Sequence, residues 1–395
     1  MAISEKVLGF MERASWIRKM FEEGIRLKQE FGEENVFDLS LGNPVAEPPE
    51  AVKAAIVKAA QDPAPGRHRY MPNAGFPDVR AAIANALSAE CKVTLGPDDI
   101  VMICGAAGGL NIALKTLLDP GDEVIVFAPY FVEYFFYADN HGGQAVAVNT
   151  KPDFSIDFDA LAAAITDRTK AVIINSPNNP TGVVYTRQAM EELAALLKEQ
   201  SQKRGKPIYL IADDPYKKIL FEGEPTPNPI EVYEDSLYIT SHSKDLAVPG
   251  ERIGYVAVHP DCADSANVVA GLIFCNRVLG FVNAPALFQR VVKEVQHVTV
   301  DVDAYRRRRD LLYSELTRIG YDVVKPGGAF YFFPKSPLED EMQFIEILTA
   351  KKVLVVPGRG FGAPGYFRLS YCFPDAVIEG ALPGLEAAFR EARNG

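Results

Sequence analysis

A lysine stands between two serines and an aspartate in SHSKDLAVPGERIGY, the stretch Ser241–Tyr255, and an arginine follows eight positions after it. The lysine, Lys244, comes just after the apolar run SLYIT, and a Pro-Gly pair precedes the arginine, Arg252. A lysine is ordinarily a solvated surface charge, so a chemical role for Lys244 needs support from other residues. A neutral lysine amine attacks carbonyl compounds, and an arginine binds phosphate or carboxylate groups.

Two further apolar runs end in residues that could do chemistry. AVIIN ends in Asn175 and leads into SPNNPTG, which contains Asn179, while IYLIA leads into DDPY, which contains Asp213 and Tyr216. Each residue alone has an ordinary explanation, such as a turn, a helix cap or a solvated face. In an open α/β sheet, however, ligands bind beyond the carboxyl ends of the strands. The pattern therefore predicts that an amide, a carboxylate, a phenol and the Lys244 amine converge on one site.

A glycine-rich stretch, CGAAGGLNIALKTLL, follows the apolar run IVMIC and is predicted to open a helix. The free N–H groups of a helix N-terminus favour a phosphate. The stretch matches neither the dinucleotide fingerprint nor the ATP-binding loop. The SxxK spacing of Ser241 and Lys244 occurs in penicillin-binding enzymes, but the SDN and KTG partners of that motif are missing. A phosphate cradle, a lysine, a carboxylate and a phenol together favour pyridoxal 5'-phosphate as cofactor.

The elements that position these residues are predicted from a repeating sequence pattern that begins near Asp98. Short apolar runs alternate with helical segments and predict an α/β fold with a parallel sheet covered on both faces. Upstream, Glu12–Phe31 is predicted to form one amphipathic helix, and from about Ala284 long helices precede two or three strands. We expect an N-terminal segment (1–45) that joins a smaller C-terminal α+β domain (284–395), and a large cofactor-binding domain (46–283). The apolar runs are IVMIC, EVIVFA, AVIIN, IYLIA, SLYIT and GYVAV.

The composition narrows the class of protein. The 395 residues carry a net charge of −11, which disfavours nucleic acid and anionic membranes as partners. The five cysteines are scattered without a CxxC pair, which is typical of reduced thiols in a cytoplasmic protein. No histidines stand at ligand spacing, so no metal is expected. No apolar run has membrane-spanning length, and the first residues do not form a signal peptide.

The chain resembles the class I/II aminotransferases of the aspartate aminotransferase fold, which are fold-type I pyridoxal phosphate enzymes. The resemblance extends from about Phe37 to Phe389 and implies a mostly parallel, seven-stranded sheet between helices. NNPTG followed by SxSK and RxGY is highly specific as a set. The motifs occur in the order LSLGNP, YMPNAG, GAAGGLNIAL, SPNNPTG, DDPY, SHSK, PGERIGY, GGAFYFFP and FRLSY.

The resemblance also implies roles for the residues that would perform the chemistry. Lys244 would form the Schiff base with the cofactor and later carry the substrate proton. Asp213 would pair with the pyridine nitrogen, with Asp214 outside that contact. Tyr216 and Asn179 would donate hydrogen bonds to the phenolic oxygen of the cofactor.

The cofactor phosphate would be held by Ser241, Arg252 and the backbone of Ala106 and Ala107. Phe131 falls where an aromatic ring stacks on the cofactor.

Further residues would bind the substrate or a second subunit. Arg368 would hold the substrate α-carboxylate as a bidentate fork, with the backbone of Gly42 beside it. Tyr70 would reach the phosphate of the neighbouring subunit, which implies a homodimer with shared active sites. No role is assigned to His242, and Arg277 is more readily explained as a surface charge.

The resemblance predicts an aminotransferase that moves an amino group from an amino acid to a 2-oxo acid. A β-lyase or decarboxylase on the same cofactor is the alternative, because the motifs bind only cofactor and α-carboxylate. A non-catalytic regulator is disfavoured by the charge of −11 and by the absence of an added DNA-binding segment. Aspartate, alanine and aromatic donors all remain open. An aromatic-tolerant pocket could be lined by Phe10, Trp16, Tyr130, Phe131, Tyr134 and Phe281.

Overall fold

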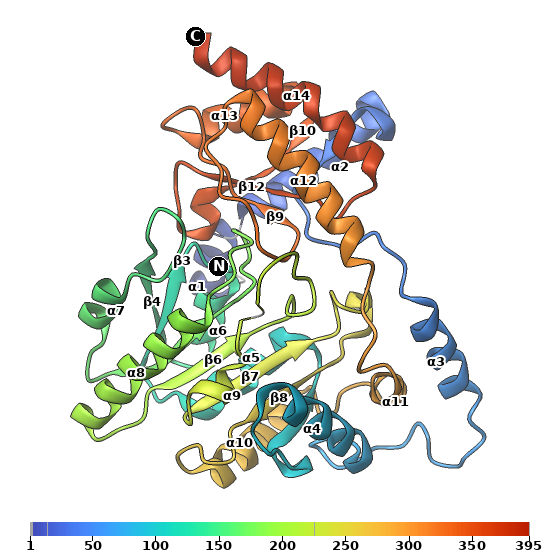
Figure 1. Cartoon of the computed structure of the whole chain (residues 1–395), viewed down its shortest axis with the longest axis vertical. Helices are drawn as coiled ribbons and strands as arrows, with labels where there is room; N and C mark the ends of the chain where they lie inside the picture. Colours follow the sequence, from blue (N-terminus) through green and yellow to red (C-terminus); the bar gives the residue numbers. More distant parts are fainter. Residues whose placement is uncertain (1–2, 14, 225, 395) are drawn as a thin grey trace.

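The computed structural model describes residues 3–13, 15–224 and 226–394, with the side chains of residues 12–21 outside the description. A seven-stranded sheet lies at the centre of the larger part of the molecule (Figure 1), in the order β2-β8-β7-β6-β5-β3-β4. β8 runs in the direction opposite to the other six strands, which are parallel to one another. This confirms the mostly parallel seven-stranded sheet. The strands are β2 (Ile100–Ile103), β3 (Glu123–Ala128), β4 (Gln144–Asn149), β5 (Thr169–Ile174), β6 (Tyr209–Asp213), β7 (Ser236–Ser241) and β8 (Gly254–Val258).

All six predicted apolar runs form strands of this sheet, and one strand was not predicted. The additional strand, β4, lies at the edge of the sheet beside β3. Of its residues only Val148 is buried. The strand contains the short apolar run AVAV (145–148), but this run was not among those interpreted as strands.

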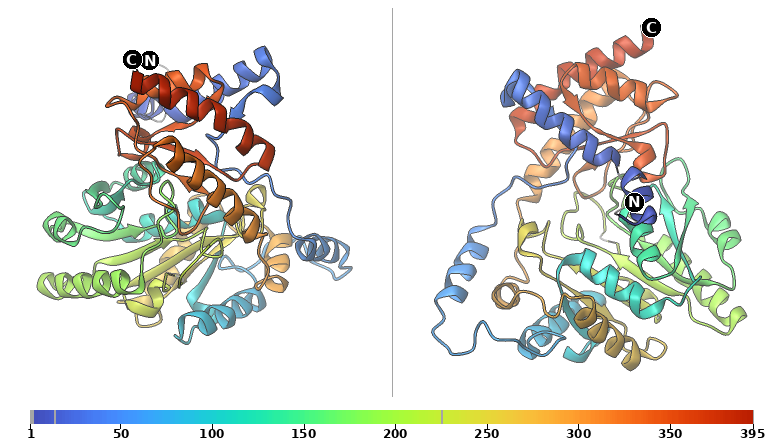
Figure 2. Two further views of the ribbon diagram at one scale, coloured as in Figure 1. Left: turned by 45° about the horizontal axis from the view of Figure 1, so that its top comes forward. Right: turned by 180° about the vertical axis from the view of Figure 1, so that it is seen from behind.

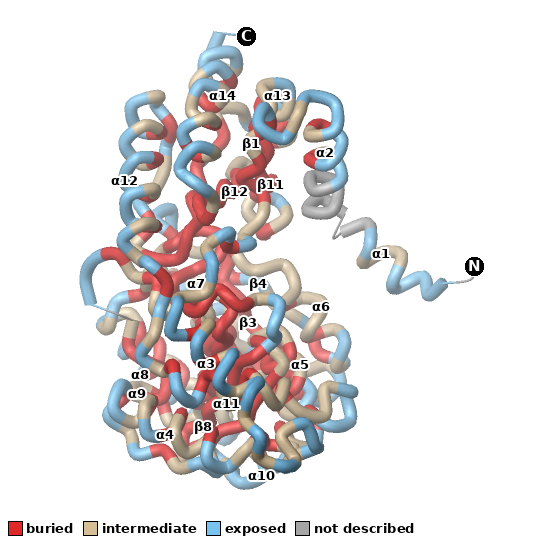
Figure 3. The backbone as a smooth tube through the Cα atoms, turned by 90° about the vertical axis from the view of Figure 1, so that its right-hand side faces the viewer, coloured by how far each residue is buried: buried red, intermediate tan, exposed pale blue. Residues whose placement is uncertain are grey.

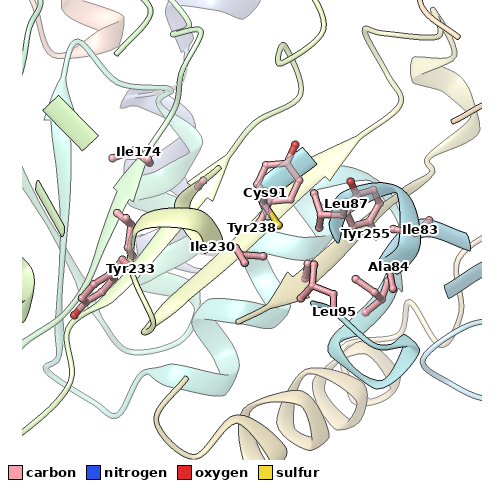
Figure 4. Close-up of a cluster of buried hydrophobic side chains, with 14 of the residues drawn as sticks. Ile83, Ala84, Leu87, Cys91, Leu95, Ile174, Ile230, Tyr233, Tyr238 and Tyr255 are labelled. Carbon is pink, nitrogen blue, oxygen red and sulfur yellow. The ribbon is translucent and has the colours of Figure 1, made fainter. Parts of the chain in front are cut away.

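Helices cover both faces of the sheet, as predicted. Alternate side chains of each strand enter opposite apolar layers, because successive side chains of a strand point to opposite faces. In β6, Ile211 packs in the layer with α5, while Leu210 packs in the layer with α4 and α8. Figure 4 shows part of the second layer, where Leu87 of α4 lies near Tyr238 and Tyr255 of the sheet. The helices of this part are α3 (Glu50–Gln61), α4 (Pro77–Cys91), α5 (Gly105–Leu117), α6 (Glu133–Asn140), α7 (Phe158–Ala164), α8 (Arg187–Arg204), α9 (Pro229–Val232), α10 (Ser265–Val278) and α11 (Ala286–Glu294).

Segments from both halves of the chain, including β1 and α14, meet in the smaller part of the molecule (Figures 1 and 2), which has its own apolar core, whereas α1 (Glu5–Arg13) lies beside α6 of the larger part. The short strand β1 near the N-terminus pairs in parallel with β10, and β11, β12 and β9 form an antiparallel sheet. Figure 3 shows buried segments in both parts. The domain boundaries at residues 45 and 283 stay predictions. The elements are β1 (Phe37–Asp38), β9 (Tyr331–Phe332), β10 (Val353–Leu354), β11 (Val356–Pro357), β12 (Phe367–Ser370), α12 (Val302–Ile319), α13 (Glu341–Ala350) and α14 (Asp375–Asn394).

The prediction of one helix over Glu12–Phe31 was wrong in its extent. The segment belongs to two helices, α1 (Glu5–Arg13) and α2 (Ser15–Phe31), and residue 14 between them lies outside the described residues. In the described part of the chain, no helix combines the length and apolar character needed to cross a membrane. All five cysteines are free thiols.

Candidate active site

A cavity of about 330 Å³ opens at the carboxyl ends of β5, β6 and β7, where the sequence predicted a site. Every predicted site residue except Tyr70 lines it. They come from the loop after β1, the start of α5, the loops after β3, β5, β6 and β7, and strand β12. They are Gly42, Ala106, Ala107, Phe131, Asn179, Asp213, Tyr216, Ser241, Lys244, Arg252 and Arg368.

Lys244 and Arg252 enter the cavity together because β7 and β8 are antiparallel neighbours. Ser241, the last residue of β7, lies opposite Gly254, the first of β8, so the loop between them leaves and re-enters the sheet at one edge. The Nζ of Lys244 donates a hydrogen bond to the carbonyl of Gly42 at 2.8 Å. Burial lowers the pKa of Lys244 to about 8, and the charge of Arg252 acts in the same direction. A lysine with a lowered pKa is neutral more often and is a better nucleophile.

The Asp213 carboxylate lines the same cavity as Lys244, and one of its two oxygens has no hydrogen-bond partner in the described chain. Asp213 is 6% exposed, and its Oδ2 accepts a hydrogen bond from the Tyr134 hydroxyl at 2.7 Å. Its Oδ1 is buried and has no hydrogen-bond partner among the described residues. Burial raises the pKa of Asp213 to about 6. A buried carboxylate oxygen without a partner is costly, so it is suited to a ligand that brings a donor or a positive charge.

An anion site lies at the first turn of α5. Arg252 follows the short helix Pro249–Glu251 and has a left-handed backbone, with φ of 52°, which turns the chain back toward α5. A Cβ on Gly105 would lie 2.5 Å from the Arg252 Nη2 and would displace this guanidinium, and the φ of 73° at Gly105 also favours glycine. The backbone N–H groups of Ala106 and Ala107 belong to the same first turn. A guanidinium beside a helix N-terminus attracts a phosphate.

Arg368 is fixed on the other side of the cavity. Its Nη1 donates to the Asn179 side-chain oxygen at 2.9 Å, and its Nη2 donates to the Ser40 carbonyl at 2.7 Å. The guanidinium stacks against Tyr331 and Phe361, with 4.7 and 4.8 Å to the ring centroids. Its Nε is buried and has no partner in the described chain. A planar guanidinium held in this way is suited to a carboxylate.

The positions of these groups depend on residues to which the sequence assigned no role. Asn175 donates from its amide to the Asp213 carbonyl and accepts from the backbone N–H of Asn179, both at 2.6 Å. The hydroxyls of Tyr216 and Tyr331 lie 2.9 Å apart. Asn175 was recognised only as a strand end, and Tyr331 lies in the quoted motif GGAFYFFP.

Tyr331 also explains the glycine in LSLGNP. A Cβ on Gly42 would come within 2.0 Å of the Tyr331 hydroxyl oxygen. Gly42 therefore presents only backbone to the cavity, and its carbonyl holds the amine of Lys244.

Several candidates lie outside the cavity. Tyr70 is 90% exposed and lies in a surface groove, and Arg277 is exposed at the end of α10. His242 and Asp214 line a second, smaller cavity of about 30 Å³. Asp214 thus lies outside the cavity that contains Asp213, as expected.

The six aromatic residues do not form one pocket. Phe131 lines the main cavity, and the Tyr134 hydroxyl is bound to Asp213. Phe10 and Tyr130 line a separate cavity beside α1, of about 620 Å³, while Phe281 lies in the surface groove of Tyr70. The side chain of Trp16 lies outside the described residues.

Comparison with known proteins identifies the family. The family model for aminotransferase class I and II matches residues 34–385. The aspartate/prephenate aminotransferase of Thermus thermophilus is 36% identical over 350 residues, which are 87% of this chain and 88% of that protein. The crystal structure of an amino transferase from Eubacterium rectale has 40% identity and a TM-score of 0.95, with 99% of both chains covered.

An aspartate aminotransferase of Thermus thermophilus, solved with maleate, has 32% identity and a TM-score of 0.84, with 95% of this chain and 96% of that chain covered. The match to the family model and the coverage of these relatives extend over the two parts of the fold and the whole cavity. The chain therefore belongs to the class I and II aminotransferases, enzymes that transfer an amino group from an amino acid to a 2-oxo acid.

Proposed function

We propose that the cavity binds pyridoxal 5'-phosphate and that Lys244 binds its aldehyde covalently in the resting enzyme, until the amine of the donor displaces it. The observation that carries the proposal is the buried Oδ1 of Asp213, which has no hydrogen-bond partner among the described residues and belongs to a side chain that lines the same cavity as Lys244. A protonated ring nitrogen would supply the donor that this oxygen lacks. The phosphate fits the anion site formed by Arg252, Ser241 and the first turn of α5. The residues present thus fit the cofactor at both of its ends.

When bound, the cofactor supplies an aldehyde that condenses with amines and a ring that withdraws electrons from the substrate Cα. Arg368 binds the α-carboxylate as a fork, and Asn179, held by Arg368 and Asn175, fixes the orientation. The displaced Lys244 Nζ would accept the α-proton and deliver it to the former aldehyde carbon of the cofactor. Its lowered pKa, about 8, leaves a usable fraction of free amine near neutral pH. Asp213 keeps the ring nitrogen protonated.

We also propose a homodimer in which Tyr70 reaches the phosphate site of the second subunit. Tyr70 is 90% exposed, and the apolar side chains of Phe274 and Val278 on α10 are also exposed, at 55% and 50%. The groove of Tyr70 includes Phe281, whose ring packs near Gly108 in α5. The groove therefore borders the helix that bears the phosphate site. Sedimentation equilibrium of the holoenzyme and a Tyr70→Phe variant with weakened cofactor binding would support this assembly. A cytoplasmic location stays a prediction.

The absorption spectrum of the protein with pyridoxal phosphate tests the assignment. We expect a visible band that one class of amino acid bleaches and a 2-oxo acid restores. Release of ammonia and pyruvate instead of restoration would indicate a lyase reaction. A protein that takes up no pyridoxal phosphate would overturn the proposed roles of Lys244 and Asp213.

A further inference from the structure

One charged group of the cavity has no place in the proposed function. The charged side chains that line it, in the described chain, are Lys244, Arg252, Arg368, Asp213 and Glu133. The first four are assigned to the cofactor aldehyde, its phosphate, the substrate α-carboxylate and the ring nitrogen. Glu133 remains. No cation among the described lining residues is left for a second substrate carboxylate.

Glu133 lies on the substrate side of the cavity. It is the first residue of α6 and stands two positions after Phe131 in the same wall. The Arg368 guanidinium is near enough to lower the pKa of Glu133, although burial outweighs it and the net shift is upward. The phosphate end of the cavity, by contrast, is formed by Arg252 and α5. Glu133 therefore belongs to the end where the substrate is bound.

One oxygen of the Glu133 carboxylate lacks a partner in the described chain, while the backbone N–H of Glu133 donates a hydrogen bond to the carboxylate. Its Oε2 is buried and makes no hydrogen bond to any described residue. A buried carboxylate oxygen without a donor is costly, and the cost is recovered when a ligand supplies a cation or a donor. Arg368 faces the α-carboxylate, so the group that meets Glu133 must come from the substrate side chain.

Resting on the proposed function, we propose that Glu133 selects amino donors whose side chain ends in a positively charged nitrogen. The same residue disfavours donors and acceptors with a second carboxylate, because two carboxylates in a poorly hydrated cavity repel each other. The chain thus differs in its preferred substrate from relatives named for aspartate. Glu133 is a specificity-determining residue rather than a participant in proton transfer.

Binding of unreactive acids to the holoenzyme, measured by calorimetry, tests the proposal without turnover. Three ligands have a main chain of five atoms, counted from the carboxylate carbon to the terminal carbon: 3-guanidinopropanoate, pentanoate and pentanedioate. They share one carboxylate for Arg368 and differ in the group at the far end. The seven-atom series is 5-guanidinopentanoate, heptanoate and heptanedioate. In at least one series, we expect the guanidino acid to bind about tenfold or more tightly than the diacid, with the neutral acid between them. A diacid that binds as tightly as the guanidino acid in both series overturns the proposal.

Variants separate the role of Glu133 from general effects. In Glu133→Gln the affinity ratio of guanidino acid to diacid should fall toward one, because the charge is lost while the shape is kept. Glu133→Thr should do the same and replaces the first variant if that one unfolds. Glu192→Gln makes the same change on the exposed face of α8 and should keep the ratio. A ratio that is unchanged in both Glu133 variants contradicts the proposal.

Half-reactions distinguish a failure of this inference from a failure of the proposed function. Ornithine, lysine or arginine should bleach the cofactor band faster than aspartate and glutamate do. If aspartate or glutamate bleaches it faster, the cofactor assignment stands and the Glu133 proposal is wrong. If no amino acid changes the spectrum, the proposed function fails, and the ligand series then decides on Glu133 alone.

Discussion

Two cavities lie at the ends of the same two strands, β6 and β7, and they differ in almost every chemical respect. The main cavity, of about 330 Å³, contains Asp213 and Ser241. The small cavity, of about 30 Å³, is lined by Asp214 and His242, the residues that follow them directly in the sequence. One residue along the chain therefore separates a ligand site from a space for about one or two waters.

The pleat of the strands explains this separation. In β6, Tyr209 and Ile211 face the apolar layer of α5, and the next alternate residue is Asp213. Leu210 faces the opposite layer, and the same alternation leads to Asp214. Because the period is two, the parity of a residue decides which cavity it enters. The proposed cofactor site thus lies on the face of the sheet that carries the N-terminus of α5.

The carboxylates of Asp213 and Asp214 are both destabilised in their charged form by burial, but their surroundings differ. Burial raises the pKa of Asp213 to about 6 and that of Asp214 to about 7. Each side chain has one buried oxygen without a hydrogen-bond partner in the described chain, but Asp213 lines a cavity large enough for a cofactor, whereas Asp214 lines only a water-sized space. We infer that a bound cofactor relieves the first cost and leaves the second.

The largest contrast is expected between two lysines, one from each cavity. Lys244→Ala should lower turnover by about 10⁴-fold or more, the upper range for a positioned acid–base group. Lys217→Ala, at the small cavity, removes a pair with Glu90 at 2.7 Å and should cost less than about threefold. Steady-state rates at saturating pyridoxal phosphate measure both. Comparable losses in the two variants would contradict the assignment of catalysis to the main cavity.

The adjacent aspartates give the next largest contrast. Asp213→Asn should reduce turnover by about 100-fold or more, because a neutral amide does not keep the ring nitrogen protonated. Asp214→Asn should change turnover by less than about tenfold. Cofactor affinity, titrated by absorbance, should fall only in the first variant. Equal losses would mean that both cavities serve the cofactor.

The rate at which the cofactor-free protein captures pyridoxal phosphate should rise with pH. The pKa of Lys244 is lowered to about 8, mainly by burial, and only the neutral amine attacks. Below pH 8 the neutral fraction grows about tenfold per pH unit, and above pH 8 it levels off. Stopped-flow absorbance between pH 6 and 10 measures the profile. A plateau reached only above about pH 10 would show that Lys244 keeps an ordinary pKa.

Stability should respond to pH through Asp214. Its pKa is raised from an ordinary 3.8 to about 7, chiefly by burial, so between these values the folded protein holds a proton that the unfolded chain has released. Stability therefore falls as pH rises from about 4 to 7, and the loss persists above it. Asp214→Asn removes this loss and should raise the free energy of unfolding by about 1–3 kcal/mol at pH 8.

Urea unfolding of the holoenzyme at pH 8 and at pH 4 measures the effect of Asp214→Asn. The gain should be small at pH 4, where both states hold the proton for at least part of the time. Asp213→Asn is the matched control and should bring no such gain, because the cofactor relieves the burial of Asp213. A gain for Asp214→Asn that is the same at both pH values would exclude titration as its cause.

Much of this arrangement could be predicted from the sequence, and the remainder depends on packing. The apolar runs located six of the seven strands, and their polar ends located the main cavity, because strand ends and side-chain chemistry are local properties. The edge strand β4 has only one buried residue, but its run AVAV (145–148) is a local signal that was overlooked. Glu133 was missed because it lies in none of the recognised motifs and its place in the cavity wall depends on tertiary packing.

Substitution of His242 is expected to have the smallest effect on turnover. It also tests most directly whether the two cavities act independently. His242 stands two residues before Lys244, yet its Nδ1 is 3.1 Å from the Asp245 carboxylate and its Nε2 is buried without a partner in the described chain. His242→Asn can keep one hydrogen bond to Asp245, so we expect unfolding to become easier by about 1 kcal/mol and turnover to change less than about threefold. Urea unfolding and steady-state kinetics measure the two quantities. If turnover fell more than tenfold while stability held, the small cavity would act on Lys244, and the two cavities would form one functional unit despite the sheet between them.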